Sequence, residues 1–368
     1  MIRRIAIAAF VLVVPATALA VPSDAQLAGQ RIGWPVDGTS VSPSMRAAIQ
    51  RGEVGAVILF GRNATSRSVL ARLTSTLQAI PRPTGLNVPL LVMTDQEGGL
   101  VKRVAWVPPT ASAARMGATM TPARIRAQGV ATARGLAALG INANLAPVCD
   151  VAARGSYMAR DQRAFGRTAA KVAADCTAFA TGLAAGGTAA AVKHFPGFGR
   201  ARVNTDDAPV RITASRSALM ADLAPFRHAI RAGVPMVLVS SAIYPALAWQ
   251  PAMLSRAITD ELLRGTLGFE GVTVSDAVDT PALAPWGGTR GAARRAATAG
   301  MDIVLLSGTE AVAQGAQQAI ASGITSGAIP RADALMSLER VLALRRHLAR
   351  GSAGGPAMRP APAPRPGS

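Results

Sequence analysis

The chain has 368 residues, 50% of them hydrophobic, and a formal net charge of +19 from 39 basic and 20 acidic residues. Its length fits one large α/β domain or two ordinary ones. Its arginines are scattered rather than set in a stripe with aromatic residues, so the sequence predicts no nucleic-acid partner. Electrostatic association with an anionic cell wall fits better, although a compositional preference for arginine explains the charge equally well.

The first twenty residues have the pattern of a secretory signal peptide. Two arginines precede an apolar stretch that is interrupted at Pro15, and Ala18 and Ala20 form a small-x-small end. The stretch is shorter than the roughly 20 residues that a membrane-spanning helix needs, which disfavours the alternative of a membrane anchor. We therefore expect a secreted, extracytoplasmic protein.

Eight short apolar runs alternate with alanine-rich segments that have helical spacing. The runs cover residues 31–36, 55–60, 89–94, 141–146, 189–194, 235–240, 271–275 and 301–306. This alternation predicts parallel strands joined by helical crossovers, and the count of eight predicts a closed (β/α)8 barrel of the TIM type. We expect one α/β domain over residues 21–350, with a last helix at about 331–349 and a disordered Pro/Gly/Ala-rich tail over 351–368.

Polar residues follow several of these predicted strands. Asp95 follows the third run, Lys193 and His194 end the fifth, and Asp276 follows the seventh. In a parallel barrel these strand ends meet on one face, where catalytic groups lie. Each residue also has a structural alternative: Asp276 could cap a helix, Asp95 could form a salt bridge, and His194 could be a core residue. Their shared position at one rim favours a functional site.

The segments that carry these residues resemble a known family. They read GAVILFGRN (55–63), TDQEGGLVKRV (94–104), INANLAPVCDV (141–151), RAFG (163–166), AVKHFPGFG (191–199), LSRAITDELLRGTLGFEGVTVSDA (254–277) and AARRAATAGMDIVLL (292–306). In this order they are similar to the single-domain bacterial β-N-acetylglucosaminidases of glycoside hydrolase family 3. The resemblance implies a barrel that removes terminal β-linked N-acetylglucosamine from muropeptides or related glycans, with retention of configuration.

The resemblance also implies roles for individual residues. Asp276 corresponds to the nucleophile, which a retaining glycosidase needs for attack on the anomeric carbon. The matching substrate contacts are Asp95, Arg103, Arg163, Lys193 and His194. We expect Asp95 and Arg103 to pair across the glycine turn as a planar clamp for sugar hydroxyls.

The chain departs from the family's pattern where the acid/base should lie. The family's loop reads Lys-His-Phe-Pro-Gly-His-Gly, then four residues, then an Asp-Ser-His segment that supplies an Asp-His acid/base dyad. Here Phe198 replaces the first loop histidine, Asn204 the dyad aspartate and Asp206 the dyad histidine. Asp206 is a candidate replacement acid, with Asp207 as the second choice, and a turn without catalytic function is an equal alternative.

Neighbouring residues bear on this acid hypothesis. An aspartate acid needs a raised pKa, and contact with Arg200 or Arg202 would lower it. Two further departures are Leu100, where the family usually has arginine, and Ser241, where it commonly has histidine.

Three functions therefore remain open. The first is a retaining β-N-acetylhexosaminidase, the second a sugar-binding barrel with weakened catalysis, and the third a β-glycosidase of another sugar preference. We expect a carbohydrate partner, a monomer, and neither a cofactor nor a metal, because no cysteine or histidine pair has ligand spacing.

The two cysteines, Cys149 and Cys176, are compatible with one disulfide outside the cytoplasm. However, Cys176 lies on the apolar face of a predicted helix with Val172, Phe179 and Leu183. Because buried free thiols are common at such positions, we expect unpaired cysteines.

Overall fold

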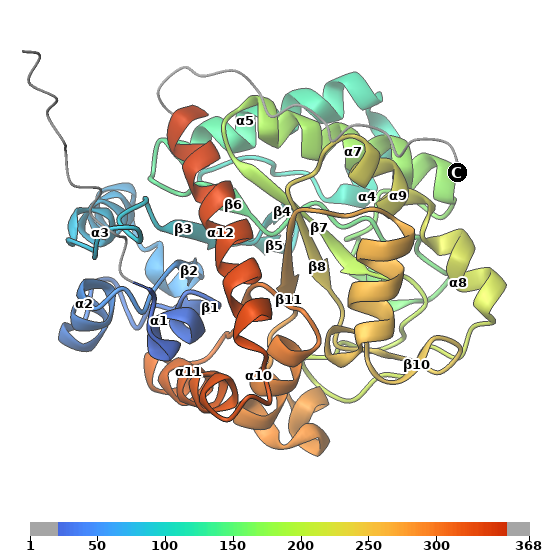
Figure 1. The fold of residues 1–368 in the computed structure, drawn as a ribbon. Coiled ribbons are helices and arrows are strands. Elements are labelled where there is room, and N and C mark those ends of the chain that lie inside the picture. The colour runs from blue at the N-terminus through green and yellow to red at the C-terminus, as the bar shows by residue number, and fades with distance from the viewer. Residues whose placement is uncertain (1–20, 352–368) are drawn as a thin grey trace, which may run out of the picture.

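The computed structural model describes residues 21–351, and its centre is a barrel of eight parallel strands (Figure 1). The strands are β1 (Ile32–Pro35), β2 (Ala56–Leu59), β3 (Leu91–Thr94), β6 (Ala143–Asn144), β7 (Ala189–Phe195), β8 (Met236–Val239), β11 (Val272–Ser275) and β12 (Val304–Leu305). From β1 to β11 each strand pairs with the next in this series, and β12 pairs with β1. A parallel bridge between Val274 and Ile303 closes the ring. The predicted (β/α)8 barrel is therefore confirmed. The predicted signal peptide and all of the predicted tail except Gly351 lie outside the described residues.

Both faces of the barrel strands are buried, which explains why they read as continuous apolar runs in the sequence. Alternate residues point inward, such as Ala56 and Ile58 of β2 and Leu91 and Met93 of β3, and together they form one buried cluster inside the ring. The residues between them, such as Val57 and Val92, belong to a second cluster that includes residues of the surrounding helices. This two-layer core fixes the strand ends on which the polar residues lie.

The helices surround the barrel, and shorter elements lie in the loops. The α-helices are α1 (Asp24–Gly29), α2 (Pro43–Gln50), α3 (Arg67–Ala79), α4 (Ala113–Thr119), α5 (Pro122–Ala137), α6 (Tyr157–Arg160), α7 (Ala169–Ala185), α8 (Arg216–Asp222), α9 (Ala224–Arg231), α10 (Gly288–Thr298), α11 (Glu310–Thr325) and α12 (Arg331–Gly351). The other helical elements are the 3₁₀ helices η1 (Gly61–Asn63), η2 (Ala252–Leu254) and η4 (Pro281–Trp286) and the π-helix η3 (Ala257–Thr266). Two glycines bring α5 and α7 together, because a Cβ on Gly129 or Gly182 would lie 2.4 or 2.2 Å from a carbonyl oxygen of the other helix.

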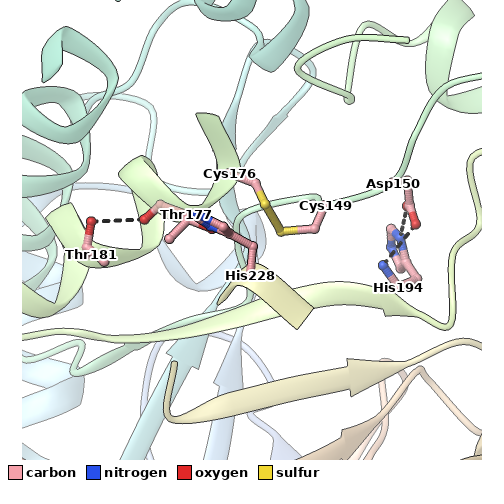
Figure 2. Close-up of a disulfide and its surroundings, with 7 residues drawn as sticks. All are labelled: Cys149, Asp150, Cys176, Thr177, Thr181, His194 and His228. Carbon is pink, nitrogen blue, oxygen red and sulfur yellow. Dashed lines mark hydrogen bonds and ion pairs between the residues drawn. A yellow bond between two sulfur atoms is a disulfide. The ribbon is translucent and has the colours of Figure 1, made fainter. Parts of the chain in front are cut away.

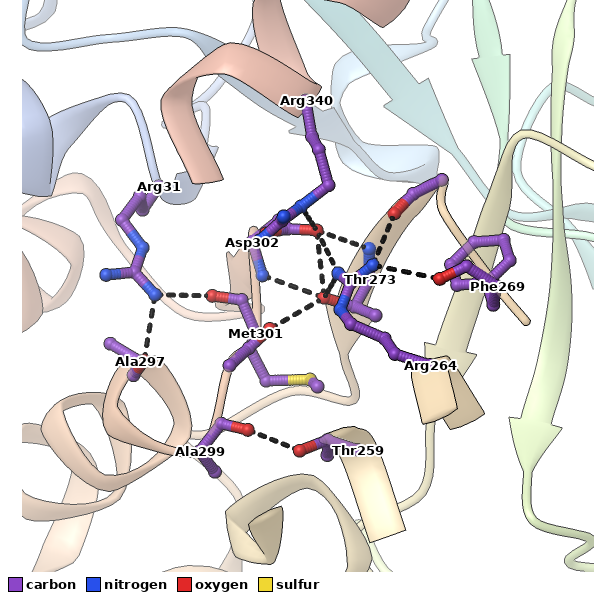
Figure 3. A network of polar contacts seen from close by, with 12 residues as sticks. Arg31, Thr259, Arg264, Phe269, Thr273, Ala297, Ala299, Met301, Asp302 and Arg340 are labelled. Carbon is purple, nitrogen blue, oxygen red and sulfur yellow. Dashed lines mark hydrogen bonds and ion pairs between the residues drawn. The ribbon is translucent and has the colours of Figure 1, made fainter. Parts of the chain in front are cut away.

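The last helix, α12, covers the N-terminal opening of the barrel. Its residues Val341 and Leu344 belong to the buried cluster inside the ring. Its Arg345 is buried and donates to the carbonyl oxygen of Pro89, just before β3. A second anchor is Asp302, just before β12, whose carboxylate accepts hydrogen bonds from Arg264 of η3 and Arg340 of α12 at 2.7 and 2.9 Å (Figure 3). The opposite, C-terminal opening is left for the polar residues.

Two small antiparallel hairpins follow strands at the C-terminal end. One joins β4 (Gln96–Gly98) to β5 (Val101–Lys102), and the other joins β9 (Ile243–Tyr244) to β10 (Ala248–Pro251). The sequence pattern did not predict these hairpins. Within residues 21–351, the helices are too short or too polar to cross a bilayer.

Candidate active site

A cavity of about 380 Å³ lies at the C-terminal ends of the barrel strands. It is lined by all seven of the site residues predicted from the sequence: Asp95, Arg103, Arg163, Lys193, His194, Asp206 and Asp276. Asp95 directly follows β3, Lys193 and His194 lie in the last part of β7, and Asp276 directly follows β11. Residues from distant parts of the chain therefore meet in one pocket.

Two acids and two bases form a network on one side of this cavity. Lys193 Nζ lies 2.6 Å from Asp95 Oδ1 and 2.7 Å from Glu97 Oε1. Arg163 donates from Nε and Nη2 to the two carboxylate oxygens of Glu97, at 2.9 and 2.8 Å. The four charges balance, so the network offers hydrogen-bond donors and acceptors without a net charge. Such a surface suits a neutral, hydroxyl-rich ligand better than a charged one.

The network keeps its buried members ionised. Burial alone would raise the pKa of Glu97, but the charges of Arg163 and Lys193 outweigh it and hold that pKa well below its usual range. Burial would lower the pKa of Lys193, but Asp95 and Glu97 outweigh it and raise that pKa. Both groups are therefore charged throughout the neutral pH range.

Glu97 was not among the residues predicted from the sequence. It is 4% exposed, and it joins Arg163 to Lys193. A signal was present, because Glu97 lies two residues after Asp95 and alternate residues of an extended chain point to the same side.

The expected side-chain pair between Asp95 and Arg103 is not formed. The Asp95 carboxylate pairs with Lys193 instead, while the backbone N–H of Arg103 donates to the Asp95 carbonyl oxygen at 3.2 Å. The Arg103 guanidinium lies 5.9 Å from the centre of the Phe60 ring, and its buried Nε has no hydrogen-bond partner within residues 21–351. Lys193 is the nearer cation because β7 carries it into the centre of the pocket. Arg103 keeps donors for a ligand.

His194 is held by a buried aspartate that the sequence analysis missed. His194 Nδ1 lies 2.7 Å from Asp150 Oδ2, and the other carboxylate oxygen accepts from the backbone N–H of Phe198 at 2.7 Å. Arg163 Nη2 lies 3.5 Å from His194 Nε2. Because a carboxylate can only accept, Nδ1 carries the proton that is directed at Asp150. The ring is thus fixed in one orientation at the pocket wall.

The expectation of unpaired cysteines is wrong. Cys149, which directly precedes Asp150, forms a disulfide with Cys176 of α7 (Figure 2). Cys176 does lie on the buried face of its helix, as predicted, but the loop after β6 brings Cys149 against that face. A thiol in an apolar environment can be either free or paired, and the helical pattern alone does not reveal which residue packs opposite.

Asp276 directly follows β11, and its partly buried carboxylate lines the cavity. Ser241 Oγ donates to its Oδ2 at 3.1 Å, and the backbone N–H of Ala277 donates to its Oδ1 at 3.0 Å. Burial raises the pKa of Asp276, a charge on His194 would lower it, and the negative charge of Asp206 raises it further. Ser241, where the family commonly has histidine, therefore orients the proposed nucleophile.

The loop after β7 brings Asp206 to the cavity and leaves Asp207 out of its lining. Asn204 Nδ2 donates to Asp206 Oδ2 at 2.9 Å. Arg200 does not contact Asp206, because it pairs with Asp222 of α8 at 2.6 Å. Arg202 is exposed, and its carbonyl oxygen accepts a hydrogen bond from Arg160. These arrangements favour Asp206 over Asp207 as the candidate acid.

Two further departures from the family's pattern have clear places in the structure. Phe198 is buried, with its ring centre 5.7 Å from that of His194 and 6.3 Å from that of Tyr157. An aromatic residue thus fills the space beside His194. Leu100, in the turn between β4 and β5, is 75% exposed.

Over residues 21–351, no group of three or more His, Cys, Asp or Glu side chains is placed to hold a metal ion.

Comparisons with known proteins agree with this architecture. The sequence profile of the glycosyl hydrolase family 3 N-terminal domain matches residues 25–344. An "uncharacterized secreted glycosyl hydrolase" of Arthroderma benhamiae is 35% identical over 346 residues, which cover 91% of this chain and 96% of that protein.

Two solved structures are also similar. The β-N-acetylhexosaminidase of Beutenbergia cavernae has a TM-score of 0.82 and 35% identity, over 89% of this chain and 99% of that chain. The family 3 β-N-acetylglucosaminidase of Paenibacillus sp. has a TM-score of 0.84 and 32% identity, over 93% of this chain and 65% of that longer chain. Together with the profile match, these similarities show that the chain belongs to glycosyl hydrolase family 3.

Proposed function

We propose that this protein is a secreted, retaining β-N-acetylhexosaminidase that removes terminal β-linked N-acetylglucosamine from cell-wall fragments or related glycans. The observation that carries the proposal is the partly buried Asp276 carboxylate, oriented by Ser241 and Ala277 at a cavity with a charge-balanced wall. The two solved relatives named above act as a β-N-acetylhexosaminidase and a β-N-acetylglucosaminidase, which supports the substrate class.

Substrate binding would use the charge-balanced network. Lys193 and Arg163 offer donors to sugar hydroxyls, while Asp95 offers acceptor oxygens beside them. His194 keeps its Nε2 on the cavity side, because Asp150 holds Nδ1. Arg103 also lines the cavity, where its guanidinium group would contribute a further donor. These fixed dipoles would position the anomeric carbon without a charged substrate group.

The chemistry would proceed in two displacements. The Asp276 carboxylate attacks the anomeric carbon, the bond to the leaving oxygen breaks, and Asp206 supplies the proton that this oxygen takes up. Asp206, now a base, then removes a proton from water as that water attacks the anomeric carbon and releases Asp276. Burial raises the pKa of Asp276, so the nucleophile is a stronger base than an exposed aspartate.

A sugar-binding barrel with slow turnover is the second candidate. The exposed position of Asp206 favours it, because an acid that works near neutral pH is usually buried or set beside a like charge. Without effective acid assistance, turnover of natural glycosides would fall by about 10²–10⁴-fold. A β-glycosidase of another sugar preference is the third candidate.

Secretion is part of the proposal. The signal-peptide pattern of residues 1–20 supports it, as does the Cys149–Cys176 disulfide, because disulfides persist mainly outside the reducing cytoplasm. The relative from Arthroderma benhamiae is a secreted protein, which adds support. We further propose that residues 21–350 act as one barrel domain, as a monomer, with electrostatic attraction to an anionic wall from a positive net charge, which is +19 for the full chain including Arg3 and Arg4 of the signal-peptide pattern.

Nitrophenyl glycosides test the function directly. The protein should release nitrophenol from the β-N-acetylglucosaminide faster than from the β-glucoside or β-galactoside, and the β-anomer of N-acetylglucosamine should appear first by NMR. An α-anomer as first product would exclude retention, and a preference for another sugar would select the third candidate. Saturable N-acetylglucosamine binding by calorimetry without any release would select the binding barrel.

A further inference from the structure

A second cavity, of about 640 Å³, lies outside the candidate active site. It runs from β10 across the start of η3 to the C-terminal half of α10, and Figure 1 shows β10 and α10 on the same side of the barrel. Its wall includes two tryptophans and three arginines, namely Trp249, Trp286, Arg256, Arg294 and Arg295. None of these residues belongs to the site described above, so the cavity calls for its own explanation.

Trp249 is the most unusual residue of this wall. It lies on β10 with 74% of its surface exposed, whereas Trp286 at the end of η4 is half-buried. Contiguous exposed apolar surface is a feature of binding sites, and here the two indole rings line the same cavity. An indole face beside a cavity gives a flat apolar surface of the kind on which the apolar face of a sugar ring stacks.

The charge of the wall is not compensated. Arg256 forms ion pairs with Asp260 and Asp333. Arg294 and Arg295 are exposed, and their guanidinium groups make no hydrogen bond or ion pair with any residue of 21–351. Free arginine donors suit carboxylate or phosphate groups, which they bind in a bidentate manner. The wall therefore combines a stacking surface with anion-binding groups.

The position of the cavity relates it to the active site. Trp286 is the last residue of η4, and Pro281, the first residue of the same 3₁₀ helix, lines the active-site cavity. Six residues at the 3₁₀ rise of about 2 Å per residue span roughly 10 Å. A short oligosaccharide is long enough to reach from one cavity to the other.

We propose that this cavity is a second carbohydrate site that binds anionic glycans, with a pyranose face on Trp249 and sugar carboxylates on Arg294 and Arg295. It would hold a polymer at the protein surface beside the active-site cavity. The inference rests on the proposed glycosidase function for its biological meaning, but binding at this site does not require catalysis.

The test uses the full mature chain with Asp276→Asn, so that polymer is bound but not cleaved. The probe is hyaluronan, a polymer of alternating N-acetylglucosamine and glucuronate, and binding is measured by calorimetry at low and moderate salt. Trp249→Ala should raise the dissociation constant for hyaluronan at least about fivefold, because one aromatic contact is lost. Arg294→Gln with Arg295→Gln should weaken it similarly and reduce its salt dependence. Met336→Ala and Arg124→Gln, exposed residues outside this cavity, are matched controls and should change nothing.

Other probes separate the alternatives. Polyglutamate, a polyanion without sugar rings, should bind more weakly than hyaluronan and without dependence on Trp249. Equal binding of both polymers, or unchanged hyaluronan binding by Trp249→Ala, would overturn the proposal. Trp249-dependent binding of phosphatidylglycerol vesicles in place of hyaluronan would assign the surface to membranes instead. In the chain with Asp276 intact, the Trp249→Ala variant should hydrolyse the nitrophenyl glycoside at the wild-type rate. A failure of the proposed glycosidase function would therefore be distinguished from a failure of the proposed second binding site.

Discussion

Asp150 Oδ2 lies 2.7 Å from His194 Nδ1, and Asp150 directly follows the disulfide-bonded Cys149 (Figure 2). A residue with no exposed surface thus fixes the orientation and tautomer of a histidine that lines the candidate active site. Its second carboxylate oxygen is occupied by the backbone N–H of Phe198, so Asp150 also holds the start of the loop that carries Asp206. Both relationships lead to predictions.

The first prediction concerns Asp150→Asn. The amide keeps the size of the side chain but can no longer accept two charge-assisted hydrogen bonds, so His194 should lose its fixed tautomer. We expect kcat/KM for the nitrophenyl glycoside to fall about 10–100-fold, as when the carboxylate partner of a functional histidine is removed. The control is Asp175→Asn, another buried carboxylate, which pairs with Lys171 away from the cavity and should leave kcat/KM unchanged. Equal losses in both variants would show a general structural effect.

The second prediction concerns the disulfide, which links residues 27 positions apart. Replacement of both cysteines by alanine should lower the free energy of unfolding by about 3–4 kcal/mol, the expected effect of a loop of this length. Urea unfolding under non-reducing conditions measures it. Because Asp150 adjoins Cys149, kcat/KM well below the melting temperature should also fall. A fully active variant would show that the disulfide stabilises the fold without positioning Asp150.

The third prediction is that Asp276→Asn removes activity and stabilises the protein at neutral pH. Burial raises the folded-state pKa of Asp276 above its unfolded value, so the ionised form is unfavourable in the folded chain. Its contribution to stability is fully present below the unfolded pKa of about 3.9 and is lost as the pH rises through the folded pKa. The variant should therefore melt at a higher temperature than the wild type at pH 7, and the difference should shrink toward pH 4. A lower melting temperature at pH 7 would contradict this.

The fourth prediction separates Asp206 from Asp207. Because the general acid must carry its proton in the first step, Asp206→Asn should remove the alkaline limb of the kcat/KM profile. Hydrolysis of substrates with poor leaving groups should also fall by about 10²–10⁴-fold, while nitrophenyl substrates survive. Asp207→Asn, one residue outside the cavity lining, should leave both properties unchanged. The same loss for good and poor leaving groups would exclude Asp206 as the acid.

The barrel could be predicted because its strands are buried on both faces. Seven of the eight predicted runs contain an observed strand, and β7 extends one residue beyond its run. The predicted last helix matches α12 to within two residues at its end. The hairpins formed by β4 and β5 and by β9 and β10 were not predicted, because strands of two to four residues are too short to show an apolar periodicity.

The seven candidate site residues could be placed at one rim because parallel strands put their C-terminal ends together. The hydrogen-bond and ion-pair partners of these side chains could not be predicted. Glu97, rather than Asp95, bridges Lys193 to Arg163, and the partner of His194 is Asp150. Such pairs form between side chains of different strands. The spacing of residues along one strand does not show which side chains of the other strands lie within contact distance. The disulfide escaped prediction for the same reason.

The most direct test of the account is the identity of the residue that bonds to the sugar. A 5-fluoro analogue of N-acetylglucosaminyl fluoride should slow release of the glycosyl intermediate and leave it attached to the protein. Peptide mass spectrometry is expected to find one added sugar, on Asp276, and none in Asp276→Asn. A label on any other side chain, or rapid turnover of β-N-acetylglucosaminides by Asp276→Asn, would contradict the account.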